Sequence, residues 1–459
     1  MMMLSEAAAA LGASLIGADV PFTSVGTDSR YITRGQLFVA LKGDRFDGHD
    51  YVEQAKSLGA SAVLVSDNKG VGPAIFVNDT CHALGELAKY WRKKFKIPVM
   101  AITGSNGKTT IKEMMIAILA CHGGGVEKIH ATVGNLNNHI GLPLTLLKLR
   151  ATHQYSVLEM GMSHLGEIAY LTDIATPDVA VISNAGTAHI GEVGSRHNIA
   201  KAKGEIFSGL ASNGVAVINV DDDYAEYWKS LNASRKIVTF GLNADADVSA
   251  TFEEKSGVCH VQLKTKRGDA DFILNTLGIH NVRNALAACA AAIALEIPIK
   301  EIAVGLSQFH AVKGRLQRKV GVNNAVVIDD TYNANPDSMK AAINVLESLS
   351  GKKILVLGDM GELGIDASQM HAEIGAYARA ANIDTLYCLG ELSKEAVNSF
   401  GVGAKHFTHV DLLINALLQE IKPGDSVLVK GSRFMKMERI VNAIVLDADN
   451  KNLTKEEVH

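Results

Sequence analysis

The segment that decides the fold runs from Ile97 to Thr110 and reads IPVMAITGSNGKTT. Apolar and β-branched residues up to Thr103 predict a buried strand, the glycines that follow predict a tight loop, and the sequence after Thr110 predicts a helix. In such a unit the glycines let backbone N–H groups turn inward, and the helix N-terminus adds a positive potential. The segment therefore predicts a phosphate-binding loop.

Two side chains of this loop carry the expected chemistry. Lys108 would place a point charge beside the outer phosphates of a nucleotide, and the hydroxyl of Thr109 can ligate Mg²⁺. The usual pattern, G-x-x-x-x-G-K-[ST], has glycine where this chain has Ile102, so the loop has the shorter form G-x-x-G-K-T. The alternative is a glycine-rich turn with an accidental lysine. The expected nucleotide-binding residues are Gly104, Ser105, Asn106, Gly107, Lys108, Thr109 and Thr110.

Short apolar runs alternate with helical runs along most of the chain. This alternation is typical of parallel α/β sheets that are covered by helices. Helices are expected over 281–296 and 338–349, and the alanine-rich stretch 1–20 is also expected to be helical. The expected strands are 99–103, 156–160, 179–183, 215–220, 325–329, 353–357, 385–389 and 426–429.

The length of 459 residues indicates about three domains. A basic stretch that ends in proline, 93–98, and the segment 309–314 after a helix mark two expected boundaries. The prediction is an α/β protein of three domains: a smaller α/β domain over 1–97, a central domain with a phosphate-binding loop and a mostly parallel sheet over 98–312, and a Rossmann-like domain over 313–459. The run G-x-x-G-x-x-G at 358–364 leaves a dinucleotide-binding finger open as an alternative for the third domain.

Composition excludes several classes of protein. The net charge of −4 argues against a sequence-independent nucleic-acid binder, which would need a basic surface. The longest apolar run, 285–295, is shorter than the roughly 18 residues of a membrane span. No lysine or arginine precedes Arg30, so a secretory signal is not expected. Five cysteines without a C-x-x-C pair fit reduced thiols in the cytoplasm rather than a zinc cluster.

Two further residues lie where a nucleotide-hydrolysing site needs polar groups, and a run with two lysines follows them. Glu159 ends an apolar strand, where a carboxylate is costly unless it is paired or bound to metal; a side chain facing solvent is the alternative. His189 follows another strand and a loop of small residues, although a lone histidine is more often structural. Lys201 and Lys203 lie in the run 199–207, and composition alone predicts a solvated helix face there.

Taken together, these motifs resemble the Mur ligase family, the ATP-dependent peptide synthetases of peptidoglycan assembly. The resemblance covers nearly the whole chain, and the runs at 134–138 and 356–364 are similar to the last ligase of that series. The matching segments are DSR at 28–30, GQLFVALKG at 35–43, DGHD at 47–50, TGSNGKTT at 103–110, GNLNN at 134–138, HNVRN at 280–284, Gly314-Arg315, DDTYNANPDS at 329–338 and VLGDMGELG at 356–364.

The resemblance implies roles for individual residues. It makes Lys108, His189 and Lys203 catalytic, and it makes Thr109, Glu159, His189 and Lys203 ligands of Mg²⁺, with two ions expected. It also implies that Lys203 is carbamylated, because a carbamate would turn an ammonium into an anion. The resemblance further assigns nucleotide contacts to Asn281, Asn284, Arg315 and Asp330. It makes Ser29, Arg30, Asn137 and Asn138 substrate-binding residues, with Ser29 and Arg30 at the UDP-sugar.

The implied reaction is the ATP-dependent joining of D-alanyl-D-alanine to UDP-N-acetylmuramoyl-tripeptide. It would pass through an acyl phosphate and yield ADP, phosphate and the UDP-linked pentapeptide. The implied first domain binds the UDP-sugar and the third binds the dipeptide; the expected state is a cytoplasmic monomer. Four alternatives stay open: another Mur ligase, a folylpolyglutamate synthetase-like ligase, a P-loop NTPase switch that acts on a partner protein, and a nucleotide-binding module without catalysis.

Overall fold

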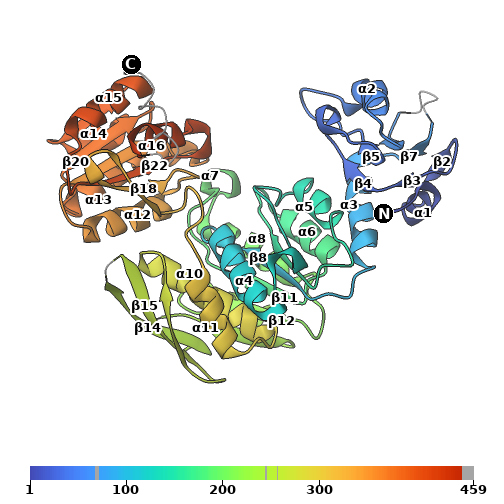
Figure 1. The fold of residues 1–459 in the computed structure, drawn as a ribbon, viewed down its shortest axis with the longest axis horizontal. Coiled ribbons are helices and arrows are strands. Elements are labelled where there is room, and N and C mark those ends of the chain that lie inside the picture. The colour runs from blue at the N-terminus through green and yellow to red at the C-terminus, as the bar shows by residue number, and fades with distance from the viewer. Residues whose placement is uncertain (68–71, 243–244, 256, 447–459) are drawn as a thin grey trace, which may run out of the picture.

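Three α/β units follow one another along the chain, and the first and third stand apart on either side of the central one (Figure 1). The computed structural model describes residues 1–67, 72–242, 245–255 and 257–446. Each main sheet takes all its strands from one of the three ranges predicted above. The α/β class and the three-domain architecture are therefore confirmed, whereas the boundaries near 97 and 312 stay a prediction.

The N-terminal unit contains a five-stranded sheet in the order β2-β7-β6-β5-β4, and only β2 runs antiparallel to its neighbour. A short ladder, β1 with β3, lies beside it. The strands are β1 (Met2–Met3), β2 (Ser14–Ile16), β3 (Pro21–Phe22), β4 (Ser24–Gly26), β5 (Gln36–Val39), β6 (Ala62–Val65) and β7 (Ala74–Phe76). The helices are α1 (Leu4–Ala10), α2 (Val52–Ser57) and α3 (Thr80–Arg92).

The helix predicted over residues 1–20 is wrong in extent. Only α1 is helical there, because Gly12 adopts the left-handed conformation (φ +57°) and ends the helix. The chain then enters β2, whose residues pair with β7. Alanine content alone predicted helix, and the pairing with a distant strand was not visible in the sequence.

The central unit contains a nine-stranded sheet in the order β16-β15-β14-β13-β12-β11-β8-β10-β9. The pairs from β9 to β14 are parallel, and β14, β15 and β16 form an antiparallel meander at one edge. The strands are β8 (Val99–Thr103), β9 (Ile129–Ala131), β10 (Tyr155–Glu159), β11 (Val179–Ile182), β12 (Val215–Asn219), β13 (Lys236–Phe240), β14 (Val248–Lys255), β15 (Val258–Thr265) and β16 (Ala270–Leu274).

Helices cover both faces of this sheet, which is why its inner strands are apolar almost throughout. Along β8, Met100 and Ile102 pack towards α4, α10 and α11, whereas Val99 and Ala101 pack towards α5, α6 and α8. The helices of this unit are α4 (Lys108–Gly123), α5 (Gly141–Leu146), α6 (Glu167–Ala175), α7 (Ile190–Val193), α8 (Arg196–Gly204), α9 (Ala225–Ser230), α10 (Ile279–Ala294) and α11 (Ile299–Gln308).

The C-terminal unit contains a six-stranded sheet in the order β17-β18-β22-β19-β20-β21, parallel except for β17. Its parallel strands do not follow the order 3-2-1-4-5-6 of dinucleotide-binding domains, which removes support for a dinucleotide finger at 358–364. The strands are β17 (Gln317–Val320), β18 (Val326–Asp330), β19 (Lys353–Gly358), β20 (Thr385–Leu389), β21 (Ala404–Phe407) and β22 (Ser426–Lys430). The helices are α12 (Pro336–Ser348), α13 (Ala367–Ala380), α14 (Lys394–Phe400), α15 (Val410–Glu420) and α16 (Glu438–Ile444).

Two expectations about the whole chain can be compared with this fold. All five cysteines are free thiols. Among the described residues, no helix is both long enough and apolar enough to span a bilayer.

Helix α3 joins the first two units into one core. Leu84, Leu87 and Trp91 belong to a single buried cluster that runs from the N-terminal sheet to α5 and α6 of the central unit. Polar contacts reinforce this junction: the Trp91 indole donates to Leu149 O (3.1 Å), and Lys89 pairs with Asp173 (2.7 Å). The N-terminal sheet is therefore fixed to the central unit through α3.

Gly85 of α3 allows this close approach, and its replacement should destabilise the protein. A Cβ atom at Gly85 would lie 2.0 Å from the Tyr170 hydroxyl oxygen and 3.1 Å from Ile174 Cδ1. We expect Gly85→Ala to lower the free energy of unfolding by about 1–3 kcal/mol, as overpacking does elsewhere. Urea denaturation would measure the change, and Tyr170→Phe in the same chain should recover part of it. A Gly85→Ala protein as stable as the wild type would contradict this account of the junction.

Candidate active site

The loop between β8 and α4 has the geometry of a phosphate cradle. Gly104 (φ +152°) and Gly107 (φ +88°) adopt backbone conformations that other residues avoid. A Cβ atom would lie 1.7 Å from Ser183 Oγ at the first position and 2.2 Å from Asn284 Oδ1 at the second. No side chain caps α4 at its N-terminus, so its first N–H groups are available to an anion. Lys108 begins the helix, and its ammonium donates to Gly104 O (2.7 Å).

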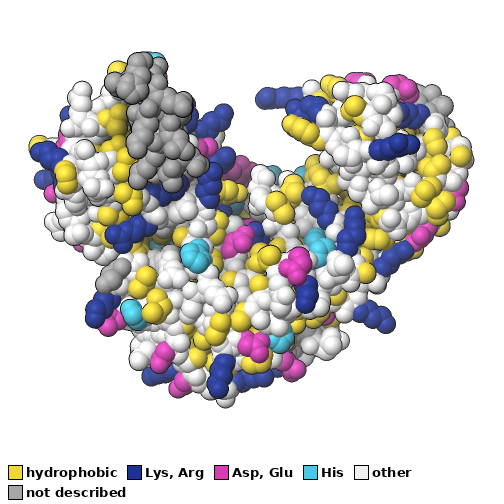
Figure 2. Space-filling view, in the orientation of Figure 1, with side chains coloured by type: hydrophobic (Ala, Val, Ile, Leu, Met, Phe, Trp, Pro, Cys, Tyr) yellow, Lys and Arg dark blue, Asp and Glu magenta, His cyan; other side chains and the backbone are white. Residues whose placement is uncertain are grey.

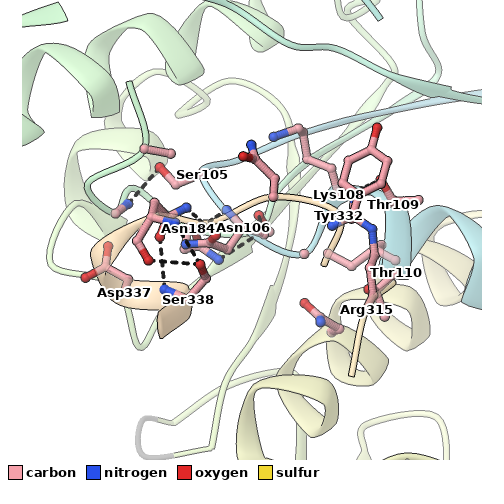
Figure 3. Close-up of a pocket in the computed structure, with 18 of the residues that line it drawn as sticks. Ser105, Asn106, Lys108, Thr109, Thr110, Asn184, Arg315, Tyr332, Asp337 and Ser338 are labelled. Atoms are coloured by element: carbon pink, nitrogen blue, oxygen red, sulfur yellow. Dashed lines mark hydrogen bonds between the residues drawn. The ribbon is translucent and has the colours of Figure 1, made fainter. Parts of the chain in front are cut away.

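Two segments, one after β11 and one after β18, make hydrogen bonds that hold the phosphate loop in shape (Figure 3). After β11, Asn184 accepts from the backbone N–H groups of Ser105 and Asn106 (both 3.0 Å), and Ser183 Oγ donates to Asn106 O (2.6 Å). From the start of α12, Asn335 Nδ2 donates to Asn106 Oδ1 (2.8 Å). The C-terminal unit therefore contacts the loop directly.

Glu159 lies at the end of β10 beside this loop, with only 1% of its surface exposed. Its Oε2 accepts from the Thr109 hydroxyl (3.1 Å), which in turn accepts from Arg315 (2.8 Å). Its Oε1 is buried and accepts no hydrogen bond from the described residues. Lys112 Nζ lies 3.6 Å from that oxygen and donates to Thr132 O (2.8 Å). Sequence analysis did not single out Lys112, although it lies one helical turn after Lys108.

His189 lies at the start of α7 in the left-handed conformation (φ +63°). Its Nδ1 is 2.6 Å from Oε2 of Glu362, a residue of the loop after β19 that is also left-handed (φ +62°). The His189 ring lowers the pKa of Glu362. The backbone N–H of Gly191 donates to Glu362 O (3.1 Å), so this loop docks on α7. Glu362 is a second site residue that sequence analysis quoted only within a motif.

Lys203 does not lie on a solvated helix face. It is 2% exposed, whereas Lys201 on the same helix, α8, is exposed. Among the described residues, its ammonium has no hydrogen-bond or ion-pair partner. Burial, with a smaller contribution from Lys108, lowers the pKa of Lys203 well below its usual value. Burial likewise lowers the pKa of Lys108 to about 8.

Three of the residues that the resemblance assigns to the nucleotide, Asn281, Asn284 and Asp330, lie on α10 and at the end of β18. Asn281 Nδ2 donates to Thr276 Oγ1 (2.9 Å), and Asn284 Nδ2 donates to Asn281 Oδ1 (3.3 Å). Asp330 pairs with Lys430 (2.6 Å) at the carboxyl ends of β18 and β22. These contacts hold the side chains in place on two sides of the cleft between the units.

One cavity of about 1430 Å³ lies between the central and C-terminal units. Figure 2 shows a broad hollow between the N- and C-terminal units. The predicted site residues that line the cavity are Ser105, Asn106, Gly107, Lys108, Thr109, Thr110, Asn137, Asn138, Glu159, His189, Asn281, Asn284, Arg315 and Asp330. Gly104 and Lys203 are not among the residues that line the cavity.

The predicted substrate-binding residues fall into two groups. Ser29 is buried and Arg30 pairs with Asp28 (2.6 Å), both in the N-terminal unit and outside the cavity lining. Asn137 and Asn138 line the cavity, and the Asn138 side chain accepts from the first backbone N–H of α5 (2.8 Å). The structure therefore does not bring these four residues into one cluster.

The side-chain oxygens of Glu159 and Thr109 are suited to binding Mg²⁺, although they do not form a complete metal site by themselves. Among the described residues, no three His, Cys, Asp or Glu side chains converge to hold a metal. Glu159 nevertheless offers a buried carboxylate oxygen without a hydrogen bond, next to the Thr109 hydroxyl. Hard oxygen ligands of this kind, completed by nucleotide phosphates and water, are what Mg²⁺ requires. Glu159 and Thr109 therefore fit the ion.

Comparison with known proteins assigns the class. Residues 21–92 match the model for the catalytic domain of the Mur ligase family, residues 102–292 the Mur ligase middle domain, and residues 314–433 the Mur ligase glutamate ligase domain. The chain belongs to the Mur ligase family.

Individual relatives narrow the comparison further. The chain is 42% identical to the UDP-N-acetylmuramoyl-tripeptide–D-alanyl-D-alanine ligase of Escherichia coli K12, over 96% of this chain and 98% of the relative. A crystal structure of MurF from Acinetobacter baumannii is 37% identical with a TM-score of 0.89, covering 95% and 97% of the two chains. The MurF ligase of Thermotoga maritima in complex with ADP is 28% identical with a TM-score of 0.82, covering 92% and 96%.

Proposed function

We propose that this protein is the ligase that joins D-alanyl-D-alanine to UDP-N-acetylmuramoyl-tripeptide at the expense of ATP. The observation that carries the proposal is the cavity between the central and C-terminal units. It is lined by the uncapped start of α4, by Lys108, and by Glu159, whose Oε1 accepts no hydrogen bond from the described residues. Near-full-length similarity to ligases of that name supports the choice of substrates. The relative crystallised with ADP supports ATP as the nucleotide.

The terminal carboxylate of the tripeptide is a poor electrophile. Transfer of the γ-phosphoryl group of ATP onto a carboxylate oxygen gives an acyl phosphate and ADP. The amine of the dipeptide then attacks the acyl carbon, the new C–N bond forms, and phosphate leaves from the tetrahedral intermediate. Lys108 and the N–H groups of α4 would stabilise the phosphoryl oxygens as charge develops on them.

The remaining site residues take supporting roles in this proposal. Thr109 and Glu159 would hold one Mg²⁺, and His189 together with a carbamylated Lys203 would hold a second. When bound, Mg²⁺ would offset the charge of the phosphates. Asn281, Asn284, Arg315 and Asp330 position the nucleotide.

Each of the three ligands, the UDP-sugar substrate, ATP and the dipeptide, would bind mainly to one domain. Ser29, Arg30, Asn137 and Asn138 would contact the UDP-sugar substrate, with residues 1–97 binding the UDP moiety. Residues 98–312 would bind ATP, and residues 313–459 the dipeptide. We place the enzyme in the cytoplasm as a monomer.

Phosphate release tests this function against its alternatives. Purified full-length chain with ATP and Mg²⁺ should release phosphate only when the UDP-linked tripeptide and the dipeptide are both present. Mass spectrometry should then find a product that weighs the two substrates minus one water, and assays with both meso-diaminopimelate and lysine tripeptides would identify the third residue. Release without these substrates, or release stimulated by a protein, would instead support a P-loop switch.

A further inference from the structure

The C-terminal sheet has a topological switch at β22. This strand lies between β18 and β19 and runs parallel to both. The helices that follow its neighbours, α12 and α13, pack on one face of the sheet, whereas α16, which follows β22, packs on the other. Chain connections that leave to opposite faces open a crevice at the carboxyl end of the strands, where α/β proteins bind ligands.

Loops from all three strands meet at the floor of this crevice. Ser432, just after β22, accepts a hydrogen bond from Gly361 N (2.8 Å) and donates one to Ala334 O (3.3 Å). A Cβ atom at Gly361 would lie 3.0 Å from the Phe434 ring, so the loops are closely packed. This packing gives the residues beside Ser432 a defined position.

Three cationic side chains of residues 313–446 line the cavity, and two of them contact other residues of that lining. Lys430 is 2% exposed and is neutralised by Asp330 (2.6 Å), with a further hydrogen bond to Asn333 O (2.9 Å). Arg315 donates to Thr109 of the phosphate loop (2.8 Å). Arg433 differs, because 62% of its side chain is exposed.

Arg433 also has N–H groups that are available to bind a ligand. Its NH1 lies 3.1 Å from Glu438, and its Nε and NH2 bond to none of the described residues. The guanidinium lies 5.9 Å from the centre of the Tyr332 ring, which gives it a rigid neighbour. A guanidinium with two free donors is suited to binding a carboxylate in two parallel hydrogen bonds.

Arg433 is connected to the phosphate loop through Tyr332 and Arg315. The Tyr332 ring also contacts Arg315 (4.2 Å), and Arg315 donates to Thr109 of the phosphate loop (Figure 3). One aromatic ring therefore contacts both Arg433 and the arginine that binds this loop. A ligand whose amine reacts near the phosphates must therefore carry its carboxylate some distance away. An extended dipeptide spans roughly 7 Å, about one residue more than a free amino acid.

We propose that Arg433 binds the terminal carboxylate of the incoming dipeptide, in the crevice at the carboxyl end of β22. This inference rests on the proposed function. The crevice holds the carboxylate beside Tyr332 and directs the amine towards the phosphate loop. A free amino acid whose amine reached the same place would leave Arg433 without its anion, so Arg433 helps to select a dipeptide.

The test compares D-alanyl-D-alanine with its C-terminal amide, which lacks the negative charge. The wild type should prefer the acid by about 10²-fold in kcat/KM, since a site built around a charged hydrogen bond rejects an analogue without it. Arg433→Gln should raise the KM for the acid about tenfold or more, leave the KM for ATP unchanged, and reduce the acid-to-amide ratio to near one. Arg433→Lys should retain part of the preference.

Arg439→Gln is the matched control. Arg439 is exposed on α16, lies outside the cavity lining and donates only to backbone carbonyls of its own turn, so its variant should behave as wild type. A wild type that ligates acid and amide equally, or an Arg433→Gln enzyme that keeps the preference, would overturn the proposal while leaving the ligase function intact. The first of these measurements needs no variant to fold. A wild type that ligates neither compound would count against the function itself.

Discussion

The Lys108→Ala enzyme should ligate its substrates roughly 10²–10³ times more slowly than wild type, because loss of one preorganised charge beside developing negative charge has a cost of that order. Lys108 starts α4, lines the cavity and lies close enough to Glu159 and Glu362 for their charges to act on it. The effect should appear in kcat, measured as phosphate release with both substrates saturating.

Two comparisons make this result specific to the charge. Lys108→Met keeps most of the side-chain volume and should lose activity to a similar extent. Lys148→Ala removes an exposed lysine from outside the cavity and should stay near wild type. Wild-type turnover in the Lys108→Ala enzyme, with circular dichroism showing an intact fold, would rule out this loop as the ATP site.

Replacement of Lys203 should also leave the enzyme nearly inactive, with a loss of roughly 10²-fold, because the proposal makes it a ligand of the second Mg²⁺ in carbamylated form. A bare ammonium would be repelled by the ion, since two unit charges of like sign about 4 Å apart already repel by roughly 4 kcal/mol at an effective dielectric of 20, and Mg²⁺ carries two charges. Carbamylation requires a neutral amine and CO₂. Because burial lowers the pKa of Lys203, the neutral amine is present at a lower pH than in a free lysine.

Rescue and labelling distinguish this role from a purely structural one. Acetate should partly restore the Lys203→Ala enzyme by supplying a carboxylate without the tether. Carbon-13 NMR with labelled bicarbonate should show a carbamate signal in the wild type that the variant lacks. Lys201→Ala, two residues away on the same helix and exposed, should keep both the signal and the activity. Full activity of Lys203→Ala would show that the carbamate is not needed.

Local signals predicted well the parts of the fold and site that depend on neighbours in sequence. The phosphate loop was predictable because strand, glycines and helix are adjacent, and β8 spans the predicted residues 99–103. The meander from β14 to β16 was missed, although Cys259, Val261 and Leu263 alternate with exposed residues as in a half-buried strand. The search for continuous apolar runs overlooked that period of two.

Contacts between distant segments could not be predicted in the same way. The burial of Lys203 results from the packing of α8, and composition predicted the opposite environment. The contact of His189 with Glu362 joins residues of two units, and neither sequence context contains information about the other. The position of Lys112 beside Glu159 likewise depends on how α4 packs against β10.

The shared core around α3 has a consequence for how the chain acquires its structure during synthesis. Residues 1–97 emerge from the ribosome first, yet α3 packs on α5 and α6, which are made later. Until those helices are made, part of the apolar surface of α3 stays exposed to solvent. Such a surface favours chaperone binding or aggregation. A fragment cut at residue 97 would keep that surface permanently, so a soluble excised version of this unit would need polar substitutions along α3.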